Sequence, residues 1–463
     1  MIFKKRQIIS LMITLLFIFT LSAGAQDFGG GSFYGESEEV QTSVSGSIYP
    51  EFRVFSDGDI EENLRGKLDI NYPGSSHEFK ILMNYQVGAA DQIEFSEVYY
   101  KYFADNYHFL LGKNRTIWGT GDQVHVVDNL NGEDLSDFIN PDYLDRQIGE
   151  EMIKIDRYFR DGRADLQFVY TPDFTPDRFA DDPESSLGNW VINPFASYLS
   201  LDKIAASSGL TQSEIINNVE DSFKDEEQQF GLRFTDSRSG IDYGVSYYRG
   251  YLREPSYDKR VVVDENGELK SLTAPNNAAE LDSFLEKLNL HYDEVDVLGF
   301  ELAAVLGSIN SRFELAYFRT DDTEGTDPLT RNNKIGWVIG GDRDLPISNL
   351  NLNIQFTGET VLDSSEIDSN PQDLQYNRDG DYTTNRAVVS IEDSYQNEKI
   401  IPKLNWVYNL KENDYTLEAE VDYELQQDLI LKFSHKIFEG DKDTTFGQFE
   451  ENDFTSLAVE YSF

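Results

Sequence analysis

Apolar and polar residues alternate along most of this 463-residue chain, a pattern typical of β-strands that have one apolar and one polar face. Between residues 40 and 54, Val44, Ile48 and Phe52 stand at even positions and mostly polar residues stand between them. We count eighteen such segments, and sixteen is the alternative count. They lie near 40–54, 63–73, 79–88, 93–103, 107–117, 152–160, 163–171, 229–236, 241–251, 296–307, 311–320, 333–342, 349–361, 384–393, 400–410, 415–424, 428–438 and 454–463.

These strands predict an all-β fold, a transmembrane antiparallel β-barrel over residues 40–463. After residue 25 no apolar run approaches the 18 residues of a spanning helix, whereas about ten alternating residues suffice for a tilted strand. The polar faces carry several charges each, and Tyr or Trp recurs near strand ends, at Tyr72, Tyr85, Trp337, Trp406, Tyr408 and Tyr423. Aromatic girdles of this kind favour a membrane barrel over a soluble sandwich.

The two ends of the chain point to the outer membrane of a diderm bacterium. Residues 1–25 have a basic start, an apolar stretch and the small residues Ala23-Gly24-Ala25, as in a signal peptide for Sec export. A short segment, 26–39, precedes the barrel. The last strand alternates and stops at Phe463, which resembles the C-terminal signal that the barrel assembly machinery reads. Outer-membrane lipid and that machinery are therefore the expected partners, and assembly of several copies is allowed without being required.

Three insertions interrupt the strands, at 118–151, 172–228 and 252–294. The second contains a capping box, Thr211 to Glu214, followed by apolar residues at helical spacing. The third predicts a hairpin around Asn266-Gly267 and then a helix with Leu281, Phe284, Leu285 and Leu288 on one face. Such long loops in barrels fold inward as a constriction, cover the mouth, or decorate the surface. We expect the helix-bearing part of 172–228 to narrow the lumen.

Composition removes several classes of function. The chain has no cysteine and only five histidines, none at metal-ligand spacing, so we expect no metal and no cofactor. A formal charge of −45 argues against a nucleic-acid partner, and 13% aromatic residues argue against disorder. No serine nucleophile motif accompanies His125, so we expect no enzyme activity.

Residues 99–176 contain Phe109-Leu110-Leu111-Gly112-Lys113-Asn114, Ile117-Trp118-Gly119, Asn140-Pro141 and Tyr170-Thr171-Pro172-Asp173-Phe174-Thr175-Pro176. This stretch is similar to the porin-like outer-membrane barrels of the alginate-export type and their relatives. Lys113 and Asn114 stand where that pattern has Arg and Gln, and outside this stretch only the strand rhythm agrees. The resemblance implies a passive or substrate-selective channel and supplies no catalytic residues.

The polar face of the predicted strands supplies candidate pore-lining residues. Strand alternation directs four carboxylates of 415–424 inward, and other strands add acidic and basic residues; the candidates are Glu301, Arg312, Glu314, Glu418, Glu420, Asp422 and Glu424. Lys113 and Arg115 share the parity of apolar neighbours, so they either turn inward at a bulge or reach the interface. A carboxylate-lined lumen favours cations. General adaptation to a saline habitat explains the acidity equally well.

The leading functional prediction is therefore a porin-like channel for small solutes or ions, with a preference for cations. The alternative is a surface adhesin or structural barrel that binds a partner through its long loops.

Overall fold

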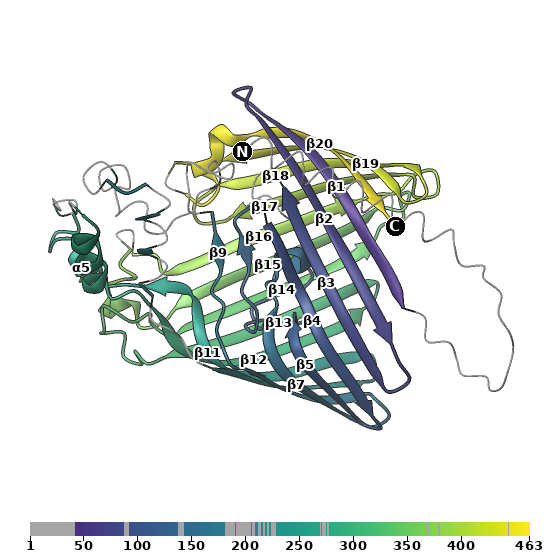
Figure 1. Ribbon diagram of the computed structural model, residues 1–463, viewed down its shortest axis with the longest axis horizontal. Coiled ribbons are helices and arrows are strands. Elements are labelled where there is room, and N and C mark those ends of the chain that lie inside the picture. Colours follow the sequence, from purple (N-terminus) through teal and green to yellow (C-terminus); the bar gives the residue numbers. More distant parts are fainter. Residues whose placement is uncertain are drawn as a thin grey trace, which may run out of the picture. The chain divides into compact units, whose positions relative to one another are not determined.

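The computed structural model describes residues 42–463 except 88–91, 138–142, 181–189, 191–204, 206–208, 212–213, 216–217, 220–221, 224–227, 269, 271–274, 276, 368–369, 378–379 and 443. The described residues contain a closed barrel of 18 antiparallel strands (Figure 1). Both the predicted fold class and the predicted strand count of 18 are confirmed.

The barrel strands follow one another in chain order. They are β1 (Ser43–Phe55), β2 (Ile60–Pro73), β3 (His77–Val87), β4 (Gln92–Ala104), β5 (Tyr107–Asn114), β7 (Glu150–Phe159), β8 (Ala164–Thr171), β10 (Gln229–Arg238), β11 (Ile241–Ser256), β12 (His291–Leu306), β13 (Ile309–Thr320), β14 (Lys334–Asp344), β15 (Asn351–Val361), β16 (Thr383–Glu392), β17 (Ile400–Asn409), β18 (Tyr415–Gln426), β19 (Leu429–Glu439) and β20 (Phe454–Ser462). Outside the barrel wall lie β6 (Asp134–Leu135), β9 (Arg178–Phe179), α2 (Tyr143–Arg146), α5 (Ala278–Leu288) and the 3-10 turns η2 (Lys259–Val261), η3 (Ser364–Glu366) and η4 (Gly447–Asn452).

Pairing of β1 with β20 closes the sheet. The register runs from Ser47 opposite Ser462 to Phe55 opposite Phe454. Beyond the last strand residue, the N–H of Phe463 donates to the carbonyl of Gly46 at 3.0 Å, and the N–H of Gly46 donates to the carbonyl of Phe463 at 2.9 Å. A closed sheet of this kind leaves no strand edge unpaired.

Some strand ends differ from the predicted ones. β5 stops at Asn114, so Arg115 belongs to the insertion rather than to a strand. β11 continues to Ser256 and β12 begins at His291, with a register shift between Tyr251 and Pro255. That shift and the charged residues around it break the apolar alternation that we used to place the ends. The insertions therefore span 115–149, 172–228 and 257–290.

Short turns gather at one end of the barrel and long connections at the other. The turn after β7, for example, uses Arg160, Asp161 and Gly162, all with positive φ. The C terminus lies at the same end as these short turns, and α5 lies at the opposite end (Figure 1). Because consecutive antiparallel strands alternate in direction, all three insertions are at the end that carries α5.

The second and third insertions pack against each other. Thr211 and Glu214 form the predicted capping box: the N–H of Thr211 donates to the carboxylate of Glu214 at 2.8 Å, and the N–H of Glu214 donates to Oγ1 of Thr211 at 3.2 Å. Ile215 and Val219 then share an apolar cluster with Leu281, Leu285 and Leu288 of α5. The predicted helix in 252–294 is confirmed. Around the predicted hairpin at Asn266-Gly267, the N–H of Asp264 donates to the carbonyl of Glu268 at 2.9 Å and the N–H of Lys270 donates to the carbonyl of Val262 at 2.8 Å. Ile216 and Leu269 lie outside the described residues, among which no helix is long and apolar enough to span a membrane.

Candidate functional site in the barrel interior

The described residues of the first insertion, 115–137 and 143–149, lie inside the barrel. Trp118, Val127 and Leu130 are buried in an apolar cluster with inward-facing side chains of β7, β8, β11, β12 and β13. The indole N–H of Trp118 also donates to the side-chain carbonyl of Gln167 on β8 at 2.6 Å. The main apolar core thus lies between this insertion and the inner wall, so the insertion fills part of the lumen.

Small residues on the inner wall make room for the insertion. A Cβ on Gly231 would lie 2.5 Å from Cη2 of Trp118, and one on Gly299 would lie 3.0 Å from Cγ1 of Val127. Ala316 on β13, opposite Gly299 in the sheet, is fully buried. Larger inward residues at these positions would displace the insertion, because protein interiors have no spare volume.

Glu314 on β13 anchors the backbone of the insertion. Its Oε1 accepts the N–H groups of Thr120 and Gly121, each at 2.7 Å, and its Oε2 accepts the N–H of Val126 at 2.8 Å. His125 Nδ1 lies 3.0 Å from Oε1. The side chain of Glu314 is 0% exposed, so it faces inward as the alternation requires but contacts the insertion instead of the open lumen.

Two titratable groups of the insertion lie beside this anchor. Burial lowers the pKa of His125, but the hydrogen bond to Glu314 and the charge of that carboxylate raise it overall. Burial raises the pKa of Asp128 to about 6, although the Tyr143 hydroxyl donates a hydrogen bond to it at 2.7 Å. Ionisation of Asp128 in the folded protein therefore lowers the free energy of unfolding.

We expect Asp128→Asn to make thermal stability less dependent on pH. Because the folded-state pKa of Asp128 is raised, the folded state holds the proton longer than the unfolded chain, so stability decreases as pH rises from about 4 to about 6. The unfolding midpoint should therefore fall less between these values in the variant than in the wild type. Parallel falls in both proteins would contradict this assignment.

The opposite side of the insertion is held by charges. Arg53 on β1 is 1% exposed and contacts Glu51 at 2.9 Å, Glu61 at 2.8 Å and Asp137 of the insertion at 2.9 Å. Lys67 on β2 pairs with Asp145 in α2. Removing one partner of a buried pair costs about 3–5 kcal/mol, so the Arg53 cluster ties the insertion firmly to β1 and β2.

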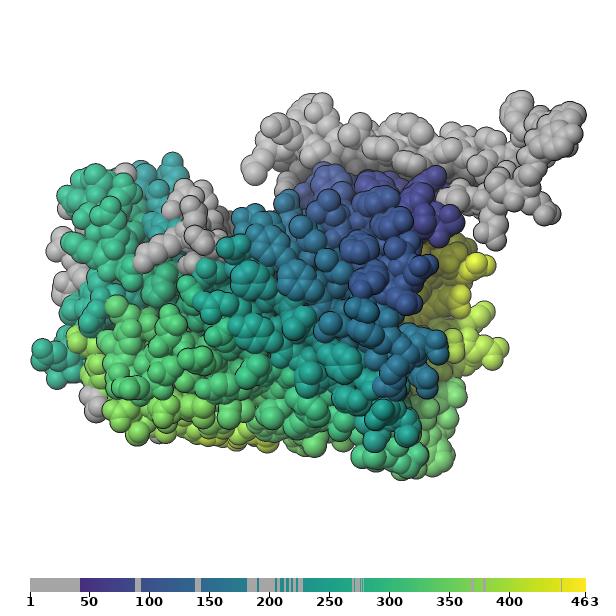
Figure 2. Space-filling model, turned by 90° about the horizontal axis from the view of Figure 1, so that it is seen from below, coloured from purple at the N-terminus to yellow at the C-terminus, as the bar shows by residue number. Residues whose placement is uncertain are grey.

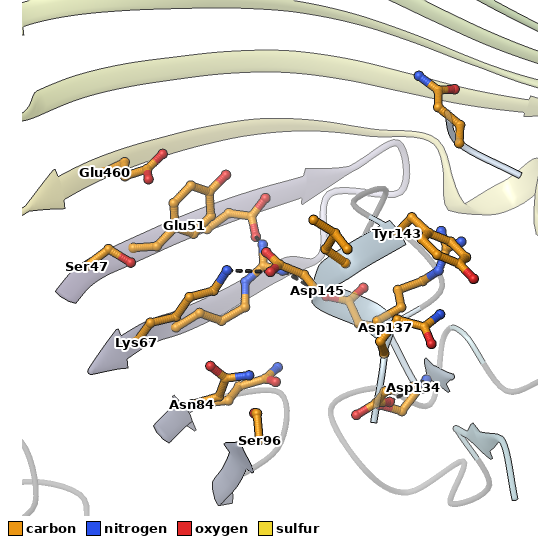
Figure 3. Close-up of a pocket in the computed structure, with 18 of the residues that line it drawn as sticks. Ser47, Glu51, Lys67, Asn84, Ser96, Asp134, Asp137, Tyr143, Asp145 and Glu460 are labelled. Atoms are coloured by element: carbon orange, nitrogen blue, oxygen red, sulfur yellow. Dashed lines mark hydrogen bonds and ion pairs between the residues drawn. The ribbon is translucent and has the colours of Figure 1, made fainter. Parts of the chain in front are cut away.

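A cavity of about 910 Å³ remains between this side of the insertion and the inner wall of β1–β4 and β17–β20. Figure 3 shows Lys67 on the wall, with Asp134, Asp137, Tyr143 and Asp145 of the insertion across from it. Serines, amides and charges dominate the lining. Nine lining residues are acidic (Glu51, Glu94, Asp122, Asp134, Asp137, Asp145, Glu418, Glu420 and Glu460) and six are basic (Arg53, Arg65, Lys67, Arg146, Lys403 and Lys432).

Every one of these charged side chains lies within 3.6 Å of an oppositely charged group. Of the four carboxylates predicted to line the pore on β18, three have ion-pair partners. Glu420 and Asp422 contact Lys403 at 3.2 and 2.8 Å, and Glu418 contacts Lys436 at 3.5 Å. Glu418 and Glu420 line the cavity, and Glu424 follows them half-buried on the same strand.

The other predicted pore-lining residues have different partners and differ in their position relative to the cavity. Glu301 is buried and pairs with Arg233 of β10, away from the cavity lining. Arg312 contacts Asp342 at 2.6 Å and Asp122 of the insertion at 3.6 Å. Lys113 follows Gly112, which has a φ of 131° within β5, and Nζ of Lys113 lies 3.5 Å from the carboxylate of the cavity-lining Glu94. Arg115 donates to the carbonyl of Leu144 at 2.7 Å and so braces the insertion.

Sequence reasoning missed Arg53, Arg65 and Lys67, although all three stand at polar positions of alternating strands. Their odd positions, between mostly apolar even positions in β1 and β2, already indicated that these side chains face inward. Asp137 and Asp145 had no such signal, because they lie in an irregular segment. Among the residues that the structure describes, no three His, Asp or Glu side chains are grouped to hold a metal ion.

No family model and no curated protein matches the chain. The resemblance to alginate-export barrels therefore stays a prediction. Solved structures of outer-membrane proteins do resemble it. OccK2 (OpdF) of Pseudomonas aeruginosa in complex with glucuronate is 12% identical over 93% of this chain and 99% of that one, with a TM-score of 0.49.

OccAB3 of Acinetobacter baumannii is 9% identical over 91% of this chain and 98% of that one, with a TM-score of 0.47. OmpF of Salmonella typhi in complex with daunomycin is 8% identical over 91% and 97% of the two chains, with a TM-score of 0.39. At these identities the similarity concerns the fold alone.

Proposed function

We propose that the protein is an outer-membrane channel of the porin type, through which small hydrophilic solutes pass passively. The observation that carries this proposal is the polar cavity of about 910 Å³ inside a closed barrel. A water-filled polar interior surrounded by a closed sheet is what a diffusion channel requires.

The outer wall supports a membrane setting. Large apolar side chains are exposed on it, such as Ile93, Leu298 and Phe433. Tyr72, Tyr100 and Tyr102 lie at the short-turn ends of their strands, and Trp406 and Tyr408 lie near the loop ends of theirs. The wall forms a continuous surface whose colours pass from blue through teal to green (Figure 2). Contact between lipid and such an apolar surface is favourable, and bands of aromatic residues lie at the two membrane–water interfaces of a barrel. The predicted signal peptide and Phe463 fit delivery by the Sec pathway and the barrel assembly machinery.

A modest cation preference follows from the cavity charges. Nine carboxylates against six basic groups leave the lining acidic, and this attracts cations. Because each of these groups is paired, the opposing fields largely cancel beyond a few ångströms, so we expect a permeability ratio only somewhat above one. General adaptation to a saline habitat stays the alternative explanation for the acidity of the chain.

Single-channel recording in planar bilayers tests this function. At low salt, where the Debye length is about 30 Å, the reversal potential in a salt gradient should indicate cation preference, which should fade at about 1 M salt. Changing Glu418 and Glu420 to Gln together with Asp422 to Asn should reduce or invert the preference, because Lys403 and Lys436 lose their partners.

The matched control for those changes removes the two basic groups. Lys403→Gln with Lys436→Gln should strengthen the cation preference. A wild-type protein that forms no conducting channel would instead favour the adhesin or structural barrel. For that alternative, the packed cluster of the second and third insertions at the loop end offers a partner surface.

A further inference from the structure

We infer that the channel favours zwitterionic solutes, which carry one cationic and one anionic group, over neutral and singly charged solutes of the same size. This inference rests on the proposed channel function. Lys67 and Asp145 are the residues that we assign to this selectivity.

The Lys67–Asp145 pair is far more exposed than the Arg53–Asp137 pair that also joins wall and insertion. Lys67 projects from β2, Asp145 projects from α2, and the pair joins the two sides of the cavity (Figure 3). Their side chains are 41% and 32% exposed, whereas those of Arg53 and Asp137 are 1% and 10% exposed. Both members of the Lys67–Asp145 pair line the cavity. A passing solute therefore meets this pair, and the Arg53 cluster behind it is shielded.

A solute that enters between Lys67 and Asp145 replaces the partner of one or both residues, and the charge of the solute decides which. A lone cation that binds Asp145 leaves Lys67 without a partner, and a lone anion at Lys67 leaves Asp145 without one. A zwitterion breaks one ion pair and forms two, so no charge in the narrow cavity loses its counter-charge. An uncharged solute gains neither contact. Because exposed pairs are weak, the exchange is rapid and reversible, as passage requires.

Two further ion pairs on the cavity wall are accessible to a solute. Lys403 and Glu420 are 26% and 22% exposed, and Lys432 and Glu460, 2.9 Å apart, are 22% and 30% exposed. Both pairs line the cavity. A zwitterion that leaves Lys67 and Asp145 thus finds other accessible pairs in the same cavity, whereas a wall of one sign would hold only one end of the solute.

Swelling of liposomes that contain the purified full-length protein tests the inference. β-Alanine and lactamide are isomers, so they match in size and differ in that only β-alanine is a zwitterion. We expect β-alanine to enter about threefold to fivefold faster than lactamide, the factor that one exposed ion pair supplies. Propionate and propylammonium salts provide the singly charged comparison and should enter more slowly than β-alanine.

Variants assign the effect to this pair. Lys67→Gln with Asp145→Asn should lower the ratio of β-alanine to lactamide entry below the wild-type value, while the reversed pair Lys67→Asp with Asp145→Lys should preserve it. Lys442→Gln with Glu451→Gln is the matched control, because that pair is 77% and 82% exposed and lies outside the cavity lining. The ratio should not change in the control.

The outcomes separate the two proposals. Lactamide entry without an advantage for β-alanine, or an advantage that is as large in the neutral double variant as in the wild type, overturns the zwitterion inference and leaves the channel intact. No entry of lactamide above the rate of protein-free liposomes overturns the channel and this inference together.

Discussion

Alanine in place of Glu314 is expected to raise the single-channel conductance severalfold while the barrel stays folded. The change removes the acceptor of the N–H groups of Thr120, Gly121 and Val126. Each buried donor without an acceptor costs about 1–3 kcal/mol, so the loss of this acceptor destabilises the inward position of the insertion. Heat-modifiable migration on a gel reports the folded barrel, and planar bilayer recording reports the conductance.

A second variant approaches the same insertion from its apolar side. Gly231→Leu places a side chain where Trp118 lies and should also raise the conductance. Glu424→Ala is the control, because it removes another carboxylate of the wall that lies outside the cavity lining. Wild-type conductance in both folded variants would show that 115–149 does not limit the bore.

Deletion of Phe463 is expected to abolish most of the folded protein in the outer membrane. The residue adds two backbone hydrogen bonds with Gly46 at the β1–β20 seam, and its ring lies over Gly46, where a Cβ would be only 2.6 Å from Cζ. The loss therefore weakens closure of the barrel as well as the assembly signal. Quantification of the heat-modifiable form in membrane fractions measures the result.

Phe433→Ser supplies the comparison for that deletion. Phe433 on β19 is also an exposed aromatic residue on the outer wall, but it lies within a strand and makes no seam contact with Gly46. We expect it to reduce folded protein far less than the deletion does. If both variants lost the same amount of folded protein, Phe463 would act only through its contact with lipid.

The strands were predictable because a barrel wall imposes the same rule on every one of them. Val421 and Tyr423 face outward and are exposed, while Glu418 and Asp422 face inward and are buried, as alternation alone requires. Strand ends were less predictable. β11 and β12 continue past the apolar zone with charged residues such as Arg253 and Glu294, where backbone pairing persists without the apolar signal.

The interior was harder to predict. Alternation placed Glu314 inward, but its partners are backbone N–H groups, which every residue has and which leave no mark in the sequence. The described residues Ile215 and Val219 of 172–228 pack with α5, and narrowing of the lumen by the helix-bearing part of this segment stays a prediction. Trp118, Val127 and Leu130 of the first insertion have no regular spacing, so only tertiary packing places them in the barrel.

The insertion 115–149 is held on its two sides by forces that respond to different conditions. Contacts of Trp118, Val127 and Leu130 with the wall are apolar and weaken on cooling, whereas the pairing of Lys67 with Asp145 is weakened by salt. Concentrated salt should therefore weaken the exposed Lys67–Asp145 contact before the buried Arg53 cluster, and cold should loosen the opposite, apolar side. Two environmental variables thus become separate controls on the bore of one barrel.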